Sequence, residues 1–200
     1  MDVKTAPPNW QLIRREQCAL VVIDVQTYFL GKLPLHWRAP LVERMAWLMR
    51  VARCLDIPII ATAEDVDRDG PLVAELAELM PSESPPIFNK VVFGLYGQED
   101  TRAAVDACGR DHFVLIGLET DVCVAQSALG LREAGYRVTA VEDACGSPPP
   151  NHETGIARMR DAGITVTSTK SLFYEWVRDL KTTHRVHAEL NIPTPAGMTL

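Results

Sequence analysis

Two stretches of four consecutive apolar residues constrain the fold of this chain most strongly. Residues 20–23 read Leu-Val-Val-Ile, and residues 113–116 read Phe-Val-Leu-Ile. A strand with an apolar side chain at every position is buried on both faces, which is typical of parallel sheets that have helices packed on both sides. The two stretches therefore predict an α/β fold with three layers.

Similar strand-like runs alternate with helical patterns along the chain. Breakers such as Pro58, Gly135 and Gly163 stand between helices and the strands that follow them. We predict a doubly wound, mainly parallel six-stranded sheet with helices on both faces, irregular segments at 31–40 and 81–86, and an irregular tail after Val186. The expected strands are 19–23, 57–61, 87–88, 112–116, 137–141 and 164–167, and the expected helices are 41–55, 72–79, 100–108, 121–134, 151–161 and 171–180.

The length of the chain fits a single domain. A protein of 200 residues buries about 70% of the surface that its unfolded form exposes, which suffices for one substantial core. We expect an N-terminal extension at residues 1–16, the domain itself at 17–182, and a C-terminal tail at 183–200.

Charge and cysteine content indicate the environment of the protein. The net charge of −6 leaves no excess of basic side chains to neutralise phosphates, so we expect no nucleic-acid partner. No apolar run is long enough to span a membrane, and residues 1–8 lack the pattern of a signal peptide. The five cysteines are widely spaced without a CxxC pair, which disfavours a disulfide framework and a zinc site. These features predict a cytoplasmic protein with reduced thiols.

Three chemically reactive side chains follow predicted strands. Asp24 ends the first apolar run, Lys90 follows the third strand, and Cys123 lies in Gly-Leu-Glu-Thr-Asp-Val-Cys-Val at 117–124, between a strand and a helix. Sites in open α/β sheets form at the carboxyl ends of strands. A nucleophilic thiol needs a neighbour that lowers its pKa or accepts its proton. The start of the helix can lower the pKa of Cys123, and Asp24 can accept its proton.

The chain resembles a known family through three segments: Val-Ile-Asp-Val-Gln at 22–26, Asn-Lys-Val-Val-Phe at 89–93, and residues 117–124. The family is that of the isochorismatase-like cysteine hydrolases, which includes nicotinamidases, N-carbamoylsarcosine amidohydrolases and isochorismatases. The resemblance covers roughly residues 17–180. It implies the strand order 3-2-1-4-5-6, which brings Asp24 and Cys123 side by side, and a homo-oligomer, namely a dimer, tetramer or octamer.

The resemblance also implies a catalytic triad. Asp24 would take the thiol proton, Lys90 would orient Asp24, and Cys123 would attack the substrate. A cis peptide bond is implied between Leu118 and Glu119, so that the N–H groups of Glu119 and Cys123 would bind the oxyanion. The expected reaction is hydrolysis of a C–N bond, amide or ureido, in a small molecule through a thioester.

No metal or other cofactor is expected. Nicotinamidases of this family carry an Asp-x-His element and a further histidine after the second strand, whereas residues 61–67 of this chain contain no histidine. The first strand is followed by neither a dinucleotide-binding nor a phosphate-binding glycine motif.

Two other functions fit the same residues. A vinyl ether hydrolase of the isochorismatase type would use Asp24 as an acid and would not need Cys123. A catalytically inactive member would bind a metabolite or a partner, or would sense oxidants through an accessible thiolate. In any of these cases, six side chains near strand ends are candidates for contacting a small molecule: Phe29, Trp37, Glu64, Phe93, Tyr96 and Thr120.

Overall fold

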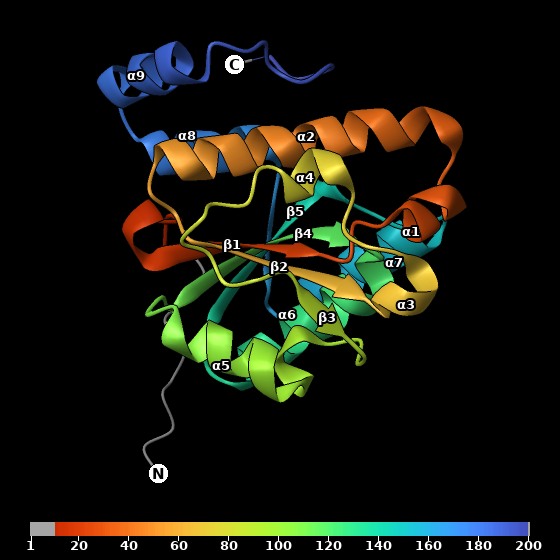
Figure 1. Cartoon of the computed structure of the whole chain (residues 1–200). Coiled ribbons are helices and arrows are strands. Elements are labelled where there is room, and N and C mark those ends of the chain that lie inside the picture. Colours follow the sequence, from red (N-terminus) through yellow and green to blue (C-terminus); the bar gives the residue numbers. More distant parts are fainter. Residues whose placement is uncertain (1–10, 200) are drawn as a thin grey trace.

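The six predicted strands form one parallel sheet. The computed structural model describes residues 11–199, so the first ten residues of the expected N-terminal extension and the final residue lie outside the described part. Strand order is β3-β2-β1-β4-β5-β6, and every neighbouring pair is parallel (Figure 1). The strands are β1 (Cys18–Ile23), β2 (Ile59–Glu64), β3 (Phe88–Lys90), β4 (His112–Leu118), β5 (Arg137–Gly146) and β6 (Thr165–Thr167). The expected fold class and strand order are confirmed.

Helices cover both faces of the sheet (Figure 1). One face carries α2 (Leu35–Cys54), α8 (Thr169–Val177) and α9 (Leu180–Leu190). The opposite face carries α5 (Glu99–Ala107), α6 (Ala125–Glu133) and α7 (Asn151–Asp161). Shorter elements connect them: η1 (Arg15–Gln17), α1 (Thr27–Lys32), α3 (Val66–Asp69), α4 (Ala74–Ala77), the 3₁₀ turn η2 (Leu95–Gly97) and the π-helical turn η3 (Thr120–Val124).

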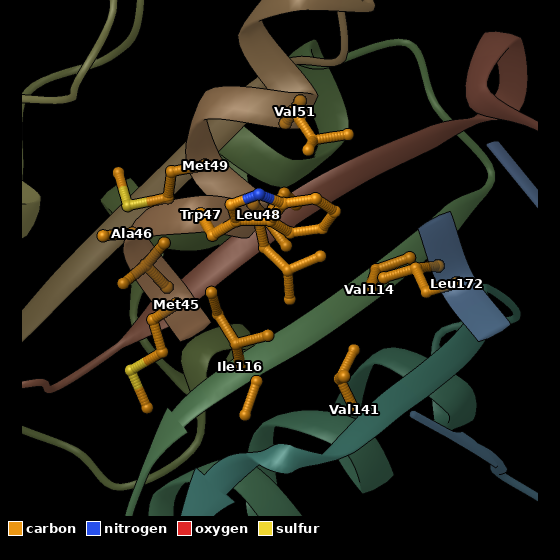
Figure 2. Close-up of a cluster of buried hydrophobic side chains, with 14 of the residues drawn as sticks. Met45, Ala46, Trp47, Leu48, Met49, Val51, Val114, Ile116, Val141 and Leu172 are labelled. Carbon is orange, nitrogen blue, oxygen red and sulfur yellow. The ribbon is translucent and has the colours of Figure 1, made fainter. Parts of the chain in front are cut away.

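The core consists of two clusters, one on each side of the sheet. Every residue of β1 is buried, and alternate side chains enter opposite clusters: Leu20 packs toward α2, and Val21 packs toward the other face. Figure 2 shows Leu48 of α2 above Ile116 of β4, on the first of these faces. The two-sided burial that the continuous apolar runs predicted is therefore present.

The segment 31–40 is helical, although we expected it to be irregular. Helix α1 runs to Lys32, and α2 begins at Leu35 with Pro40 inside it. A proline this close to a helix start removes a single main-chain hydrogen bond. Burial of the α2 side chains from Leu41 onward outweighs that loss, since eight residues of the helix are buried.

The C-terminal segment also differs from the expectation. The predicted last helix, 171–180, is divided between α8 and α9, because Arg178 adopts a left-handed conformation with a φ of 68°. Asp179 caps α9 by accepting a hydrogen bond from the N–H of Thr182, and the helix continues past Val186 to Leu190. Val186 is fully buried against the core, so the irregular tail begins after Leu190 and not after Val186 as expected, and it continues through residue 199.

Two further features bear on the environment of the protein. No helix in residues 11–199 is long and apolar enough to cross a membrane. All five cysteines are free thiols, of which Cys18, Cys123 and Cys145 are buried and Cys54 and Cys108 are half-buried.

Candidate active site

The structure brings Asp24, Lys90 and Cys123 together at the carboxyl edge of the sheet. Asp24 follows β1 directly, Lys90 ends β3, and Cys123 lies in η3, immediately after β4 and its connecting residue. The Lys90 Nζ atom lies 2.8 Å from Asp24 Oδ2, and both side chains are fully buried. Buried ion pairs occur at functional sites and also in purely structural networks, so the neighbours of this pair decide between the two.

Two glycines allow the segment around Cys123 to approach its neighbours. Gly117, opposite Ile23 in the sheet, has a φ of +136°, and a Cβ there would lie 2.1 Å from the Ile23 carbonyl oxygen. Gly155 of α7 packs on η3, where a Cβ would lie 2.7 Å from main-chain atoms of Asp121. Any larger side chain at either position would push the cysteine-bearing turn out of place.

The thiol of Cys123 contacts a carboxylate that the triad prediction did not include. The Sγ atom donates a hydrogen bond to Glu64 Oε2 at 3.0 Å. The same oxygen lies 3.5 Å from Lys90 Nζ. Glu64 ends β2, as Lys90 ends β3, and it was expected only to contact a substrate. The site therefore contains four groups: two carboxylates, one ammonium and one thiol.

Hydrogen bonds from neighbouring residues position the main chain of Glu64 and the carboxylate of Asp24. The side-chain amide of Gln26 donates to the Glu64 carbonyl at 2.7 Å and accepts from the Glu64 N–H at 2.7 Å. The Thr62 hydroxyl donates to Asp24 Oδ1 at 2.7 Å. Lys90 also donates to the Val92 carbonyl at 2.7 Å. Gln26 belongs to a segment that marks the family, and sequence reasoning gave it no role.

Burial and the two carboxylates determine the ionisation of the site. Burial first, and then the charge of Asp24, raise the pKa of the Cys123 thiol far above its ordinary value, and the nearby ammonium offsets only part of this. Burial also raises the pKa of Asp24, against the opposing effect of Lys90. Burial, the largest single influence, would lower the pKa of Lys90, but the neighbouring groups Asp24, Cys123 and Glu64 together outweigh it, so the net shift is upward.

The expectation that the helix start would lower the pKa of Cys123 is therefore wrong. A helix end stabilises an anion by at most about 2 kcal/mol, which is less than the effect of burying the thiol beside two carboxylates. The Val124 N–H at this helix start is engaged by the Glu119 carbonyl at 3.1 Å. Cys123 consequently carries its proton at rest, and attack on a carbonyl requires a base to take it.

The residues just before Cys123 adopt an unusual main-chain conformation. The peptide bond between Leu118 and Glu119 is cis. The Glu119 carboxylate pairs with Lys32 Nζ at 3.0 Å, and that ammonium lies 4.6 Å from the ring centre of Phe29. The hydroxyl of the buried Thr120 is hydrogen-bonded to His152 Nδ1 at 2.9 Å. These contacts fix the turn in front of the thiol from two directions.

The remaining expected binding residues line two other grooves. Trp37 lines a groove of about 340 Å³ together with His36 and His152. Phe93 and Tyr96 line a groove of about 670 Å³ beside α6. Neither groove includes Cys123 among its lining residues, and only 2% of Cys123 is exposed. A role for these aromatic residues in binding stays a prediction.

The cluster has the donor atoms of a small metal site, but a side chain already supplies its cation. Ligand atoms of Asp24, Glu64 and Cys123 lie within 4.8 Å of one another. The ammonium of Lys90 lies within 4 Å of both carboxylates. A metal ion would have to compete with this ammonium for the same oxygens, so these residues fit an internal ion pair better than a metal centre.

Comparisons with known proteins agree with this fold. Residues 18–171 match the Isochorismatase domain. Isochorismatase family protein 2A of Dictyostelium discoideum is 31% identical over 169 residues, which are 82% of this chain and 84% of the relative. YcaC from Pseudomonas aeruginosa, solved with hexane-2,5-diol and covalent acrylamide, superposes with a TM-score of 0.84 at 29% identity, covering 91% of each chain. The YcaC gene product of Escherichia coli, described as an octameric hydrolase of unknown specificity, gives a TM-score of 0.83 at 25% identity, covering 92% of this chain and 91% of that one.

Proposed function

The chain belongs to the isochorismatase family, and we propose that it is a cysteine-dependent hydrolase that cleaves the C–N bond of a small amide or ureido compound. The observation that carries this proposal is the contact of the Cys123 thiol with a carboxylate beside the buried pair of Asp24 and Lys90. A nucleophile next to a base, with the base next to a third oriented group, is the general arrangement for acyl transfer.

The proposed reaction has two stages. In the first stage, a carboxylate takes the Cys123 proton as the sulfur attacks the carbonyl carbon, and the resulting tetrahedral intermediate collapses to a thioester as the amine leaves with that proton. In the second stage, water attacks the thioester, and the acid product leaves as the thiol regains its proton. The sum is one amide and one water converted to one acid and one amine, without a cofactor.

We assign the oxyanion site to main-chain N–H groups. The donors are those of Glu119, next to the cis peptide bond, and Cys123, in the first turn of η3. Loss of one such donor typically costs about 3–4 kcal/mol of transition-state stabilisation. Lys90 maintains positive charge beside the reacting groups through both stages.

Two relatives support the proposal. An electrophile, acrylamide, is covalently attached in the structure of the Pseudomonas aeruginosa relative, which supports a nucleophile in this fold. An octameric relative supports a homo-oligomer for this chain. We further propose a small-molecule substrate, no nucleic-acid or membrane partner, and a cytoplasmic location.

Vinyl ether hydrolysis is the second candidate, because one observation favours it. Burial raises the pKa of Asp24, and a raised pKa suits a carboxyl group that must donate a proton. In that reaction Asp24 would protonate the substrate and the thiol of Cys123 would be dispensable. A redox-sensing role has less support, since a thiol that is 2% exposed with a raised pKa forms little reactive thiolate.

A screen for ammonia release over small amides, ureides and carbamoyl compounds tests the proposal. The variants are Cys123→Ala and, as a matched control, Cys18→Ala, which removes another buried thiol at the opposite, amino-terminal end of β1. We expect Cys123→Ala to reduce kcat/KM by about 10³-fold or more. The control should stay within threefold of the unmodified protein. Equal turnover by both variants would refute cysteine-dependent hydrolysis, and turnover of a vinyl ether by Cys123→Ala would favour the second candidate.

A further inference from the structure

The resting site directs the Cys123 thiol toward Glu64. The hydrogen bond from Sγ ends on Glu64 Oε2 at 3.0 Å. Asp24 is the second carboxylate near the thiol: its Oδ1 atom accepts from the Thr62 hydroxyl, and its Oδ2 atom lies 2.8 Å from Lys90 Nζ but makes no hydrogen bond within the described residues. Proton transfer requires a donor and an acceptor already within hydrogen-bond reach, and Glu64 meets this condition.

Glu64 is also held in place and lies on the solvent side of the cluster. Gln26 bonds to both the N–H and the carbonyl of Glu64, and its amide donates in addition to the Gly70 carbonyl at 2.6 Å. Exposure is 8% for Glu64, 2% for Cys123 and zero for the paired Asp24 and Lys90. A proton carrier must meet the leaving amine and the incoming water, and within the cluster Glu64 is the carboxylate that solvent reaches.

Charged groups from three elements face the Glu64 carboxylate. Lys90 of β3 lies 3.5 Å from Oε2, and Arg68 of α3 lies 3.9 Å from Oε1. Asp24, after β1, is the second carboxylate of the cluster. Arg68 is itself paired with Asp69 at 2.7 Å, so its hold on Glu64 is loose. Lys90 and Arg68 thus orient the Glu64 carboxylate, and its Oε2 atom accepts the hydrogen bond from the Cys123 thiol.

We propose that Glu64 is the catalytic residue that accepts the Cys123 proton and returns it, an inference that rests on the proposed cysteine-dependent hydrolysis. As the S–C bond forms, the S–H proton moves to Glu64 Oε2 and the carbonyl π electrons move to oxygen. As the C–N bond breaks, Glu64 gives that proton to the amine nitrogen. Glu64 then takes a proton from water during attack on the thioester and returns it to the departing sulfur. Asp24 keeps Lys90 in place and charged throughout.

Glu64→Gln is the test variant, and Glu75→Gln on the exposed face of α4 is its control. Glutamine keeps the size of the side chain but cannot accept and return a proton. We expect kcat to fall by about 10²–10⁴-fold with KM little changed. Glu64→Asp should recover part of kcat, because it restores a carboxylate at a longer distance from Sγ.

Alkylation of Cys123 by iodoacetamide is a second readout that needs no substrate. The Glu64 carboxylate raises the pKa of the thiol through its hydrogen bond and its charge. Removing that charge should therefore increase the alkylation rate at pH 7–8 by about threefold or more, even as hydrolysis slows. A residue with only a structural role would not speed one reaction and slow the other.

Each outcome decides the inference. Slower hydrolysis with faster alkylation supports it. A raised KM with unchanged kcat would make Glu64 a substrate-binding residue, and an unchanged alkylation rate would show that Glu64 does not act on the thiol; either overturns it. If Glu64→Gln does not fold, kcat of Glu64→Asp equal to that of the unmodified protein overturns it. Full activity in Cys123→Ala would instead refute the proposed function.

Discussion

Replacement of Lys90 by methionine should expose the electrostatic balance of the site. Methionine matches the length and apolar stem of lysine but removes its charge. In a medium of effective dielectric constant about 20, two unit charges 2.8 Å apart attract by about 6 kcal/mol, and a pair at 3.5 Å by about 5 kcal/mol. The variant no longer bears the cost of burying an ammonium, which is several kcal/mol. The expected net loss in the free energy of unfolding at pH 7.5 is therefore about 3–5 kcal/mol.

The loss should depend on pH in a defined direction. Without the ammonium, the pKa of Asp24 rises further above its unfolded value, because burial then acts unopposed. A carboxyl with a raised folded-state pKa destabilises the fold when it is ionised, so the deficit of Lys90→Met should grow from pH 5 to pH 8. Adding Asp24→Asn removes one uncompensated charge and should restore at least about 1 kcal/mol.

Urea unfolding at pH 5, 6.5 and 8 measures these differences. Lys170→Met, on the exposed surface of α8, is the matched control and should stay within about 0.5 kcal/mol of the unmodified protein. The reasoning would be refuted by a Lys90→Met variant within 1 kcal/mol of the unmodified protein at pH 7.5, or by a deficit that is equal at pH 5 and pH 8.

Three further predictions concern packing, pH and metals. Gly155→Ala should lower the free energy of unfolding by about 1–2 kcal/mol because its Cβ meets main chain at 2.7 Å, whereas Gly31→Ala, with nothing within 4 Å, should not; equal urea midpoints would contradict this. Burial lowers the pKa of His112 to about 4, so stability should fall by about 2–3 kcal/mol between pH 7.5 and 4.5, a loss that His112→Gln, measured by the same urea titration, should largely remove. Dialysis against a strong chelator should leave hydrolysis unchanged, and recovery of lost activity by one added metal would argue against Lys90 as the resident cation.

The sheet could be predicted because its signal is local. Four consecutive apolar residues at 20–23 indicate a strand that is buried on both faces, and such a strand predicts a parallel sheet covered by helices on both sides. Helix α2 was placed too late because Pro40 is a breaker by local rules, and the compensating burial comes from β4 and β5, far away in sequence. Helix α9 was not predicted, because Thr183 and Val186 are buried by packing on α2 and α8, which lie elsewhere in the sequence.

The site could be predicted only in part. Asp24, Lys90 and Cys123 stand at strand ends and in segments shared with a family, and the structure brings them to one edge of the sheet. The contact between Cys123 and Glu64 joins residues 59 positions apart and depends on side-chain conformations that no sequence pattern encodes. An acidic residue directly after a buried strand was the available signal, since Glu64 ends β2 just as Asp24 follows β1.

The direction of the Cys123 pKa shift was also beyond sequence reasoning. A helix start lowers the pKa of a cysteine, and this rule is local. Burial raises it, and the extent of burial depends on how α7 and the strand ends enclose the thiol. Of the two expected ways to activate the thiol, the structure disfavours the lowered pKa and leaves the transfer of its proton to a neighbouring base.

Detection of an acyl group on Cys123 during turnover tests the central claim most directly. The protein is mixed with a substrate from the ammonia-release screen, quenched in acid after milliseconds to seconds, digested, and analysed by mass spectrometry. The account predicts a mass increase equal to the acyl part of the substrate on the peptide that contains Cys123, forming and decaying at least as fast as kcat. Full turnover with an unmodified Cys123, or an acyl group on a different residue, would contradict it.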